Sequence, residues 1–279
     1  MNNKYPTSRL LIFSDLDGCL LDHHDYSYQP AATLLQELET LNIPVIPASS
    51  KTESELLHLR QAWDNPHPFI IENGAAVYIP KGYFPKLPDN TDEVGDFWVK
   101  RFTHPRRYWQ TLIEQAGFDA NKFQTFADCT AADIAKLTGL EQDAAVRASM
   151  RQYGEPVAWH GTLQEQEMFI AALQALGAKT EQGGRFLHVS GDCSKGQAMT
   201  WLAYQYKQAL DISVTSVAIG DSQNDISMLE SADIAVIIPS PSHPLLQLKK
   251  VHDVYVAPQP GPSGWAEIVS MILRTLHIT

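Results

Sequence analysis

The sequence has few cysteines, and they are far apart. There are three, an odd number, and none is in C-x-x-C spacing: Cys19, Cys129 and Cys193. A disulfide framework and a structural zinc site are therefore both disfavoured. The ten histidines include the adjacent pair His23 and His24, but no H-E-x-x-H motif is present. We interpret these histidines as scattered surface or capping residues.

Long apolar runs are also missing. The longest, such as 10–13 and 234–238, are far shorter than the roughly 20 residues that cross a bilayer. The first run ends at Ser14 and Asp15, so we expect no signal peptide, no membrane partner and a cytoplasmic location. Hydrophobic residues make up 44% of the 279 residues and charged residues 19%, which is typical of a globular protein with one large domain or two ordinary ones.

Positive charge is scarce. The chain carries 21 Lys and Arg against 32 Asp and Glu, for a formal net charge of −11. Proteins that bind nucleic acid usually present a basic face, and no dense basic cluster is present here, so a nucleic-acid partner is disfavoured. An anionic substrate would need a few well-placed lysines or a bound cation.

Strand-like and helix-like runs alternate from the start of the chain. In order, these runs cover 9–13, 31–41, 42–50 and 52–63. Residues 69–79 resemble two short strands around Asn73-Gly74, which is a hairpin signal. This alternation predicts an α/β fold with a parallel sheet.

The middle of the chain has a different character. Residues 80–95 are rich in Pro, Gly, Asp and Asn and are predicted to be a linker. The helix-like and strand-like segments that follow do not continue the first series; they are 104–116, 130–136, 141–151, 156–160, 165–177 and 185–190. We predict an inserted α/β domain over 84–188 and a core domain formed by 1–83 and 189–279. The core resumes with segments at 195–210, 213–225, 226–232, 233–239 and 265–276.

Polar side chains follow several of the predicted core strands. They are Asp15 and Asp17 after the first strand, Ser49, Ser50 and Lys51 after the second, Lys195 at the start of a helix, and Asp221, Asn224 and Asp225 after a late strand. The carboxyl ends of parallel strands meet at one edge of a sheet, where ligands bind. We therefore expect these distant residues to form one site.

The chemistry of this group of residues points to phosphoryl transfer. Asp15 and Asp17 have i, i+2 spacing and would point the same way on an extended strand. Packing Asp221 beside them requires a cation, and hard oxygen ligands suit Mg²⁺. One carboxylate can then attack phosphorus while Asp17 protonates the leaving oxygen and later activates water. Lys195 and Ser49 can bind the phosphoryl oxygens.

The motifs resemble those of the haloacid dehalogenase-like (HAD) phosphohydrolases. The matching residues are DLDGCLLD (15–22), Ser49, Lys195 and GDSQND (220–225). The resemblance implies that Asp15 is the nucleophile, that Asp17 is the acid/base, and that Mg²⁺ is held by Asp15, the backbone carbonyl of Asp17, and Asp221. Asp225 would orient metal waters, and phosphate binding is assigned to Ser49, Ser50, Lys195 and Asn224.

One residue departs from the HAD pattern. Cys19 stands where the family usually has Thr. That position supports the loop rather than the phosphorus, so we expect tuning of the site and no loss of activity. Cys19 is either a buried structural thiol, which we favour, or a redox site.

The insertion between the second and third motifs resembles the type-IIB cap of the Cof-like branch. Segments 44–56, 71–77, 137–140, 183–189 and 261–265 are similar to mannosyl-3-phosphoglycerate phosphatases. This resemblance implies a Rossmann-like HAD core with a parallel sheet plus an inserted α/β cap.

A substrate of that kind carries a carboxylate besides its phosphate. Arg185 and Arg151 are candidates to bind the carboxylate, although each could equally be a surface ion-pair partner. Gly261–Gly264 could present N–H groups to the ligand, with Gly264 as the candidate contact, or could form a turn before the last helix.

The predicted function is hydrolysis of mannosyl-3-phosphoglycerate, a small phosphorylated sugar, with Mg²⁺ as cofactor. One alternative keeps the chemistry and changes the substrate to another sugar phosphate, such as glucosyl-3-phosphoglycerate. A second alternative is a phosphosugar mutase. A third, a non-catalytic phospho-ligand sensor, is disfavoured because both Asp15 and Asp17 are present.

Overall fold

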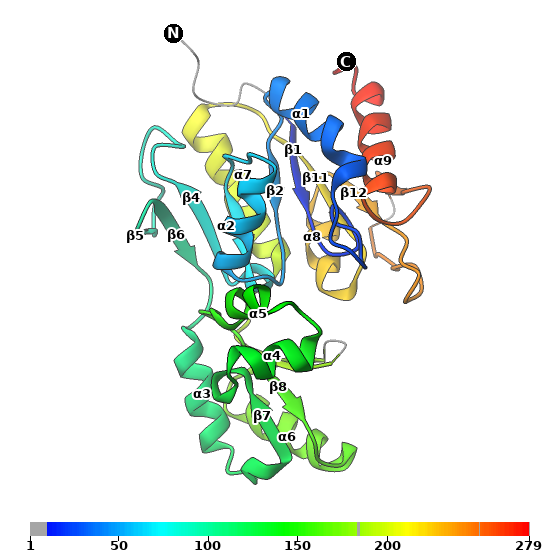
Figure 1. The fold of residues 1–279 in the computed structure, drawn as a ribbon. Coiled ribbons are helices and arrows are strands. Elements are labelled where there is room, and N and C mark those ends of the chain that lie inside the picture. Colours follow the sequence, from blue (N-terminus) through cyan, green and yellow to red (C-terminus); the bar gives the residue numbers. More distant parts are fainter. Residues whose placement is uncertain (1–9, 183–184, 251, 279) are drawn as a thin grey trace. The chain divides into compact units, whose positions relative to one another are not determined.

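The structure is a computed structural model that describes residues 10–182, 185–250 and 252–278. Two compact units make up the chain. We call one the core unit; it contains the chain up to Ser50, then Arg60–Lys100, and the chain from Ser194 onward. We call the other the inserted unit; it contains Lys51–Leu59 and Arg101–Cys193 (Figure 1).

The core unit is built on a parallel sheet with strand order β13-β12-β11-β1-β2. Its strands are β1 (Leu10–Ser14), β2 (Val45–Pro47), β11 (Thr215–Gly220), β12 (Ile234–Ile237) and β13 (Val254–Val256). β1 is buried at every position, as expected of an apolar strand covered on both faces. The pairing of β1 with both β11 and β2 brings the carboxyl ends of three strands together, which confirms the predicted α/β class.

Helices complete the core unit. They are α1 (Ala32–Thr40), α2 (Glu53–Ala62, shared with the inserted unit), α7 (Lys195–Leu210), α8 (Ile226–Ser231) and α9 (Gly261–Thr275). α7 packs against α8, and α9 packs against the short helix η1 (Gln29–Ala31) before α1. These elements agree with the periodicity of the sequence. None of the helices in the described part of the chain is long and apolar enough to cross a membrane.

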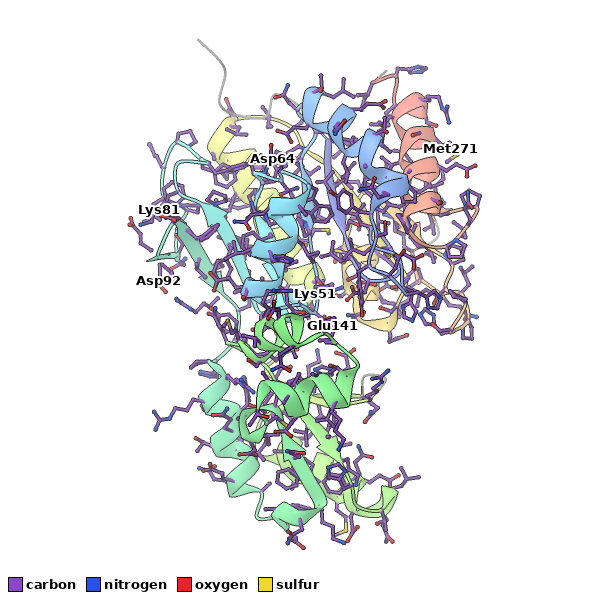
Figure 2. The ribbon with its side chains drawn as sticks, viewed as in Figure 1. Lys51, Asp64, Lys81, Asp92, Glu141 and Met271 are labelled. Atoms are coloured by element: carbon purple, nitrogen blue, oxygen red, sulfur yellow. The ribbon has the colours of Figure 1, made fainter. Side chains whose placement is uncertain are left out.

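A second, smaller sheet belongs to the core unit and has the order β3-β4-β6-β5. Its strands are β3 (Phe69–Ile71), β4 (Ala76–Pro80), β5 (Asp92–Val94) and β6 (Phe97–Arg101). β3 and β4 pair antiparallel, which confirms the predicted hairpin. Lys81 follows β4 and Asp92 opens β5 (Figure 2), and the Lys81 amide donates to the carbonyl of Asp96.

The predicted linker over 80–95 is therefore wrong in its second half. β5 pairs with β6, and the exposed side chains of β5 give no apolar alternation to reveal it. The predicted boundary at residue 84 is also wrong, because residues 84–100 complete the core unit, and the inserted unit runs to Cys193 instead of 188. It also includes Lys51–Leu59, where the Thr52 hydroxyl donates to the carbonyl of Arg147 at 2.9 Å.

The inserted unit has an antiparallel sheet with strand order β7-β8-β10-β9. Its strands are β7 (Phe123–Thr125), β8 (Glu155–Trp159), β9 (Lys179–Gln182) and β10 (Leu187–Ser190). Its helices are α3 (Arg106–Gln115), α4 (Ala131–Thr138), α5 (Gln142–Ser149) and α6 (Leu163–Ala175). Trp109, Phe169 and Leu187 lie in its apolar core, so this unit has the hydrophobic interior of a domain.

Candidate functional site

The site begins at the turn that follows β1. The Asp15 amide donates to the carbonyl of Ile219 on β11, which extends the sheet by one residue. The chain then turns, because the amides of Cys19 and Leu21 both donate to the carbonyl of Leu16. Asp17 lies in this turn, outside the strands, where it forms an isolated bridge with Leu21, so strand alternation does not set the direction of its side chain.

Gly18 is the residue that lets this turn approach the rest of the site. Its φ of +80° lies in the left-handed region, which other residues rarely adopt. A Cβ at this position would lie 2.8 Å from Oδ2 of Asp221. The glycine of the first motif therefore provides both the conformation and the space that bring Asp221 against the turn.

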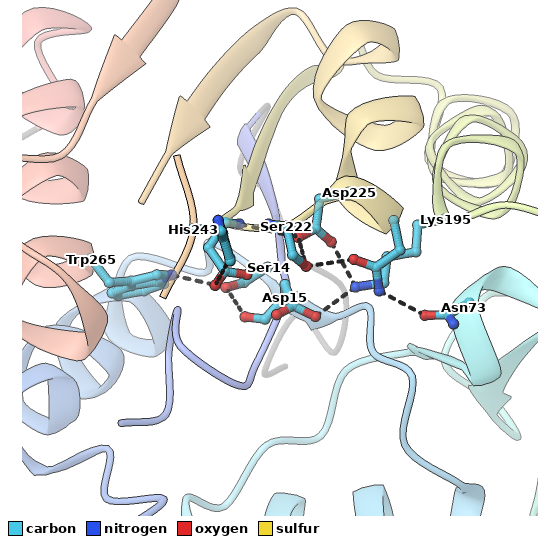
Figure 3. Close-up of polar contacts among 10 residues, drawn as sticks. Ser14, Asp15, Asn73, Lys195, Ser222, Asp225, His243 and Trp265 are labelled. Carbon is cyan, nitrogen blue, oxygen red and sulfur yellow. Dashed lines mark hydrogen bonds and ion pairs between the residues drawn. The ribbon is translucent and has the colours of Figure 1, made fainter. Parts of the chain in front are cut away.

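Lys195 holds two carboxylates of the site together (Figure 3). Its Nζ lies 2.6 Å from Oδ1 of Asp15 and 2.7 Å from Oδ1 of Asp225, and its side chain is fully buried. Burial lowers the pKa of Lys195, but the two carboxylates outweigh it and raise the pKa above its usual value, so the ammonium stays charged. Ser194 caps the helix by accepting a hydrogen bond from the amide of Gln197, which fixes where Lys195 begins α7.

The segment after β11 is ordered by Asp225. Oδ2 of Asp225 accepts hydrogen bonds from the amides of Asp221 and Ser222, each at 3.1 Å. Its other oxygen pairs with Lys195, so this buried carboxylate joins the third and fourth motifs. Asp225 thus positions the residues around it, and Asp221 is left to face the turn at Gly18.

Asn73 is a site residue that the sequence analysis did not select. Its Oδ1 accepts a hydrogen bond from Nδ2 of Asn224 at 3.0 Å, and its amide donates to the carbonyl of Ser49 at 2.9 Å. Asn73 adopts a left-handed φ of 59°, inside the turn of the predicted hairpin. The Asn-Gly signal that predicted the hairpin also marks this bridge between the second and fourth motifs.

The second motif lies close by. Ser49 is buried and its amide donates to the carbonyl of Ile70 on β3, while Ser50 is half-buried. The two serines therefore follow β2 at the same edge of the sheet as Asp15, as the sequence predicts.

Trp265 is a second residue that the sequence analysis did not select. Its indole N–H donates to Oγ of Ser14 at 3.0 Å, and that hydroxyl donates to the carbonyl of Asp15 at 2.6 Å (Figure 3). Helix α9 thereby holds the backbone of Asp15 in place through the Ser14 hydroxyl. The G-P-S-G-W segment was the available signal, but it pointed to its glycines.

Gly264 is buried in the first turn of α9. A Cβ there would lie 1.7 Å from the carbonyl oxygen of Gln259, so close backbone packing accounts for the glycine. Gly261 has a φ of +63°, at the start of the same helix. The prediction that Gly264 contacts substrate stays a prediction.

Arg185, Arg151 and Lys51 belong to the inserted unit, whereas the other predicted residues belong to the core unit. Nη1 of Arg185 donates to the carbonyls of Leu137 and Thr138 at the end of α4, and the side chain is exposed. Arg151 lies near His188; burial first and the Arg151 charge second lower the pKa of His188 to about 4. Gly183 and Gly184 of the motif before Arg185 lie outside the described residues.

Two parts of the sequence match known protein families. Residues 12–86 match a family described as haloacid dehalogenase-like hydrolase, and residues 183–270 match one described as sucrose-6F-phosphate phosphohydrolase. A glucosyl-3-phosphoglycerate/mannosyl-3-phosphoglycerate phosphatase of Methanococcoides burtonii is 34% identical over 259 residues, covering 91% of this chain and 94% of the relative. The chain belongs to the HAD phosphatases.

Solved structures share the fold of this HAD phosphatase at low sequence identity. The sucrose-phosphatase of Synechocystis sp. PCC6803, determined with sucrose and phosphate, has a TM-score of 0.60 and 13% identity, covering 94% of this chain and 97% of the other. A HAD subclass IIB sugar phosphatase has a TM-score of 0.62 and 14% identity, covering 98% of this chain and 100% of the other. These similarities support the fold of the HAD core with an added cap domain.

The buried charges of this phosphatase site fit a divalent cation. Donor atoms of Asp15, Cys19 and Asp221 all lie within 4.8 Å of one another. Burial raises the pKa of Asp15 well above its usual value, against the opposing effect of Lys195, and the nearby carboxylates raise it further. Burial and the charge of Asp225 also raise the pKa of Asp221. A cation held by the Asp15 and Asp221 oxygens would relieve this excess of negative charge.

Proposed function

We propose that this HAD phosphatase removes the phosphate of mannosyl-3-phosphoglycerate and releases mannosylglycerate, with Mg²⁺ as cofactor. The observation that carries the proposal is the 34% identity, over 91% of the chain, to a phosphatase whose name gives the glucosyl and mannosyl compounds. The glucosyl analogue is the alternative substrate. The three cysteines, all in the described residues, form no disulfide, so we keep the cytoplasm as the proposed location.

Asp15 is the proposed nucleophile. Its carboxylate forms a bond to phosphorus while the bond from phosphorus to the glycerate oxygen breaks, which gives an aspartyl-phosphate. Lys195 at 2.6 Å and the backbone bonds to Ile219 and Ser14 hold the carboxylate in place before substrate arrives. Asp17 donates a proton to the leaving oxygen, and then accepts a proton from the water that hydrolyses the intermediate.

Phosphate binding falls to residues that the turn and the hairpin bring to the same edge. We assign this role to Lys195, Ser49, Ser50 and Asn224, of which Asn224 is held by Asn73. Asp15, the Asp17 carbonyl and Asp221 would hold Mg²⁺, and Asp225 would support its waters. When bound, the metal supplies positive charge that offsets the carboxylates and the phosphate oxygens.

The inserted unit is the proposed cap and the proposed determinant of substrate choice. The phosphoryl chemistry needs only core residues, so the sugar and the glycerate must be read by other groups. Arg185 uses Nη1 for the α4 carbonyls, and its remaining N–H groups suit a carboxylate. Arg151 is the second candidate there, and Gly264 of the core unit is the third proposed substrate contact.

A substrate panel tests this function. Phosphate release would be measured with Mg²⁺ on mannosyl-3-phosphoglycerate, glucosyl-3-phosphoglycerate, sucrose 6-phosphate, mannose 1-phosphate and nitrophenyl phosphate. The proposal predicts the highest kcat/KM on the mannosyl compound, with the glucosyl compound next. A higher kcat/KM on a sugar monophosphate would contradict the substrate assignment. Interconverted sugar phosphates without free phosphate would identify a mutase.

A further inference from the structure

Cys19 is buried beside candidate metal-binding groups, whereas Cys129 and Cys193 are only half-buried. Its side chain is fully buried, and its sulfur lies within 4.8 Å of donor oxygens of Asp15 and Asp221. Within the described residues this thiol makes no side-chain hydrogen bond. The thiol therefore points into the group of carboxylates without a partner of its own.

His243 places a nitrogen beside this group, next to Asp221. It lies in the segment after β12, and its Nε2 is 3.6 Å from Oδ2 of Asp221 (Figure 3). Its Nδ1 is 3.4 Å from the carbonyl of Pro244, so the tautomer that donates there presents the Nε2 lone pair to the site. The side chain is 35% exposed, which leaves the imidazole accessible to an ion from solvent.

We define the mixed-donor cluster as Asp15, Cys19 and Asp221, whose donor atoms lie within 4.8 Å of one another, together with His243, which lies outside that group but is 3.6 Å from Asp221. The cluster offers two carboxylate oxygens, one thiol sulfur and one imidazole nitrogen. Mg²⁺ prefers oxygen ligands and waters, so the sulfur and the nitrogen are unusual ligands for it. Carboxylate, thiolate and imidazole are the three ligand types that Zn²⁺ and similar ions accept in tetrahedral sites. The donors would need to draw together, because an oxygen and a sulfur on one tetrahedral Zn²⁺ lie about 3.5 Å apart, given bonds of about 2.0 and 2.3 Å.

We propose that the mixed-donor cluster binds thiophilic divalent cations such as Zn²⁺ and Co²⁺ in place of Mg²⁺, through the Cys19 sulfur. On binding, the thiol releases its proton to water and the sulfur forms a bond to the metal. The ion ties the Asp15 carboxylate to Cys19 and His243, so that Asp15 cannot attack phosphorus. The inhibitory consequence rests on the proposed function, whereas the binding itself does not.

Direct metal binding to the full-length protein tests the proposal. Co²⁺ would be titrated into the metal-free protein while the near-ultraviolet thiolate-to-cobalt absorption is recorded, and Zn²⁺ affinity would be measured by competition. We expect the absorption in the wild type and in the control Cys129→Ser, and its loss in Cys19→Ser. We also expect Cys19→Ser to bind Zn²⁺ on the order of 10- to 100-fold more weakly. The same absorption in Cys19→Ser, or an unchanged Zn²⁺ affinity, would overturn the proposal.

A second variant covers the case in which a change at Cys19 disturbs folding. His243→Ala alters a partly exposed side chain, and we expect it to weaken Co²⁺ and Zn²⁺ binding about 10-fold. Stabilisation by Mg²⁺, measured as a melting-temperature shift, should stay as in the wild type. Equal Zn²⁺ affinity in His243→Ala and wild type would remove His243 from the cluster and contradict the proposal as stated.

An activity measurement separates this proposal from the proposed function. Zn²⁺ should stop phosphate release by the wild type at concentrations that leave Cys19→Ser at its own uninhibited rate. A protein that binds Co²⁺ through Cys19 but hydrolyses no sugar phosphate would refute the function and keep the metal site. A sugar phosphatase whose Cys19→Ser variant binds Zn²⁺ like the wild type would do the reverse.

Discussion

At the scale of single residues, Lys195 supplies the positive charge that offsets two buried carboxylates of the site. It is the one fully buried ammonium among the buried polar groups of the described chain, and it contacts both Asp15 and Asp225. The removal of one partner from a buried ion pair leaves the other charges uncompensated. The residue therefore contributes to folding and to the placement of the proposed nucleophile at once.

We predict that Lys195→Met lowers kcat by at least ~10²-fold and the free energy of unfolding by about 3–5 kcal/mol. Both effects have one cause, the unpaired carboxylates of Asp15 and Asp225. The control is Lys207→Met, on the exposed side of the same helix, which should change neither quantity by much. Urea unfolding and phosphate-release kinetics provide the two readouts, and wild-type values in both would contradict this role.

Asn73 and Trp265 show, also at the residue scale, where prediction from the sequence stops. The first-motif aspartates, Lys195 and the Asp221–Asp225 segment are predictable, since each follows an apolar run at a strand end. Asn73 forms a hydrogen bond with Asn224, which lies 151 positions further along the chain, and Trp265 forms one with Ser14, 251 positions earlier. No local pattern encodes such pairs, because they form only once the sheet has brought the segments together.

At the scale of elements, the sequence predicts those helices and strands whose apolar residues follow a clear pattern. Strand β1 and helix α7 are fully evident from their apolar positions. Strands β5 and β9 are three and four residues long and mostly exposed, so that hydrogen-bonded neighbours, not side-chain burial, define them. The misplaced domain boundary follows directly, since β5 was read as part of a linker.

The buried pair between α3 and β8 is an element-scale contact in the inserted unit. Arg106 donates from Nε and Nη2 to the two oxygens of Glu155 at 2.6 and 2.9 Å, and Glu155 is fully buried. We predict that Arg106→Met lowers the unfolding free energy of this unit by about 3–5 kcal/mol, because the Glu155 charge stays buried and uncompensated. Thermal unfolding followed by circular dichroism measures the change.

The matched control for that prediction is the pair of Lys81 and Glu93, both well exposed. Lys81→Met should cost no more than about 1 kcal/mol, because solvent already screens this pair. Equal losses of stability in Arg106→Met and Lys81→Met would show that burial does not set the strength of the α3–β8 contact.

At the scale of the whole molecule, this protein is acidic, and we propose that it binds its anionic substrate with the help of a cation. The raised pKa values of Asp15 and Asp221 mean that the metal-free protein is stabilised by protons: this stability is present at low pH and lost as pH rises through the raised pKa values. The proposed Mg²⁺ would bind the deprotonated carboxylates and replace the protons.

We therefore predict that the melting-temperature increase caused by Mg²⁺ is largest near neutral pH and shrinks as pH falls through these raised pKa values. Melting curves with Mg²⁺ and with chelator, at a series of pH values from neutral down to the ordinary range of Asp titration, measure it. Asp221→Asn should show a reduced shift at every pH. A constant shift across the range would mean that the metal does not bind through these carboxylates.

Substrate choice is the other property of the whole molecule. Arg185→Lys should lower kcat/KM for mannosyl-3-phosphoglycerate more than for nitrophenyl phosphate, because Lys lacks the two-pronged guanidinium geometry that matches a carboxylate. The quantity to compare is the ratio of the two specificity constants in variant and wild type. An unchanged ratio would leave Arg185 with only its contacts to Leu137 and Thr138.

The central claim is that Asp15 carries the phosphoryl group. A rapid-quench experiment with substrate labelled in the phosphate tests it most directly, with Mg²⁺ present and the protein recovered for peptide mapping. If Asp15 is the nucleophile, hydroxylamine-sensitive label appears on the peptide that contains Asp15. Asp15→Asn, which is nearly isosteric, should then keep its fold but acquire no label and release no phosphate. Label on a different residue, or phosphate release by Asp15→Asn at the wild-type rate, would contradict the account.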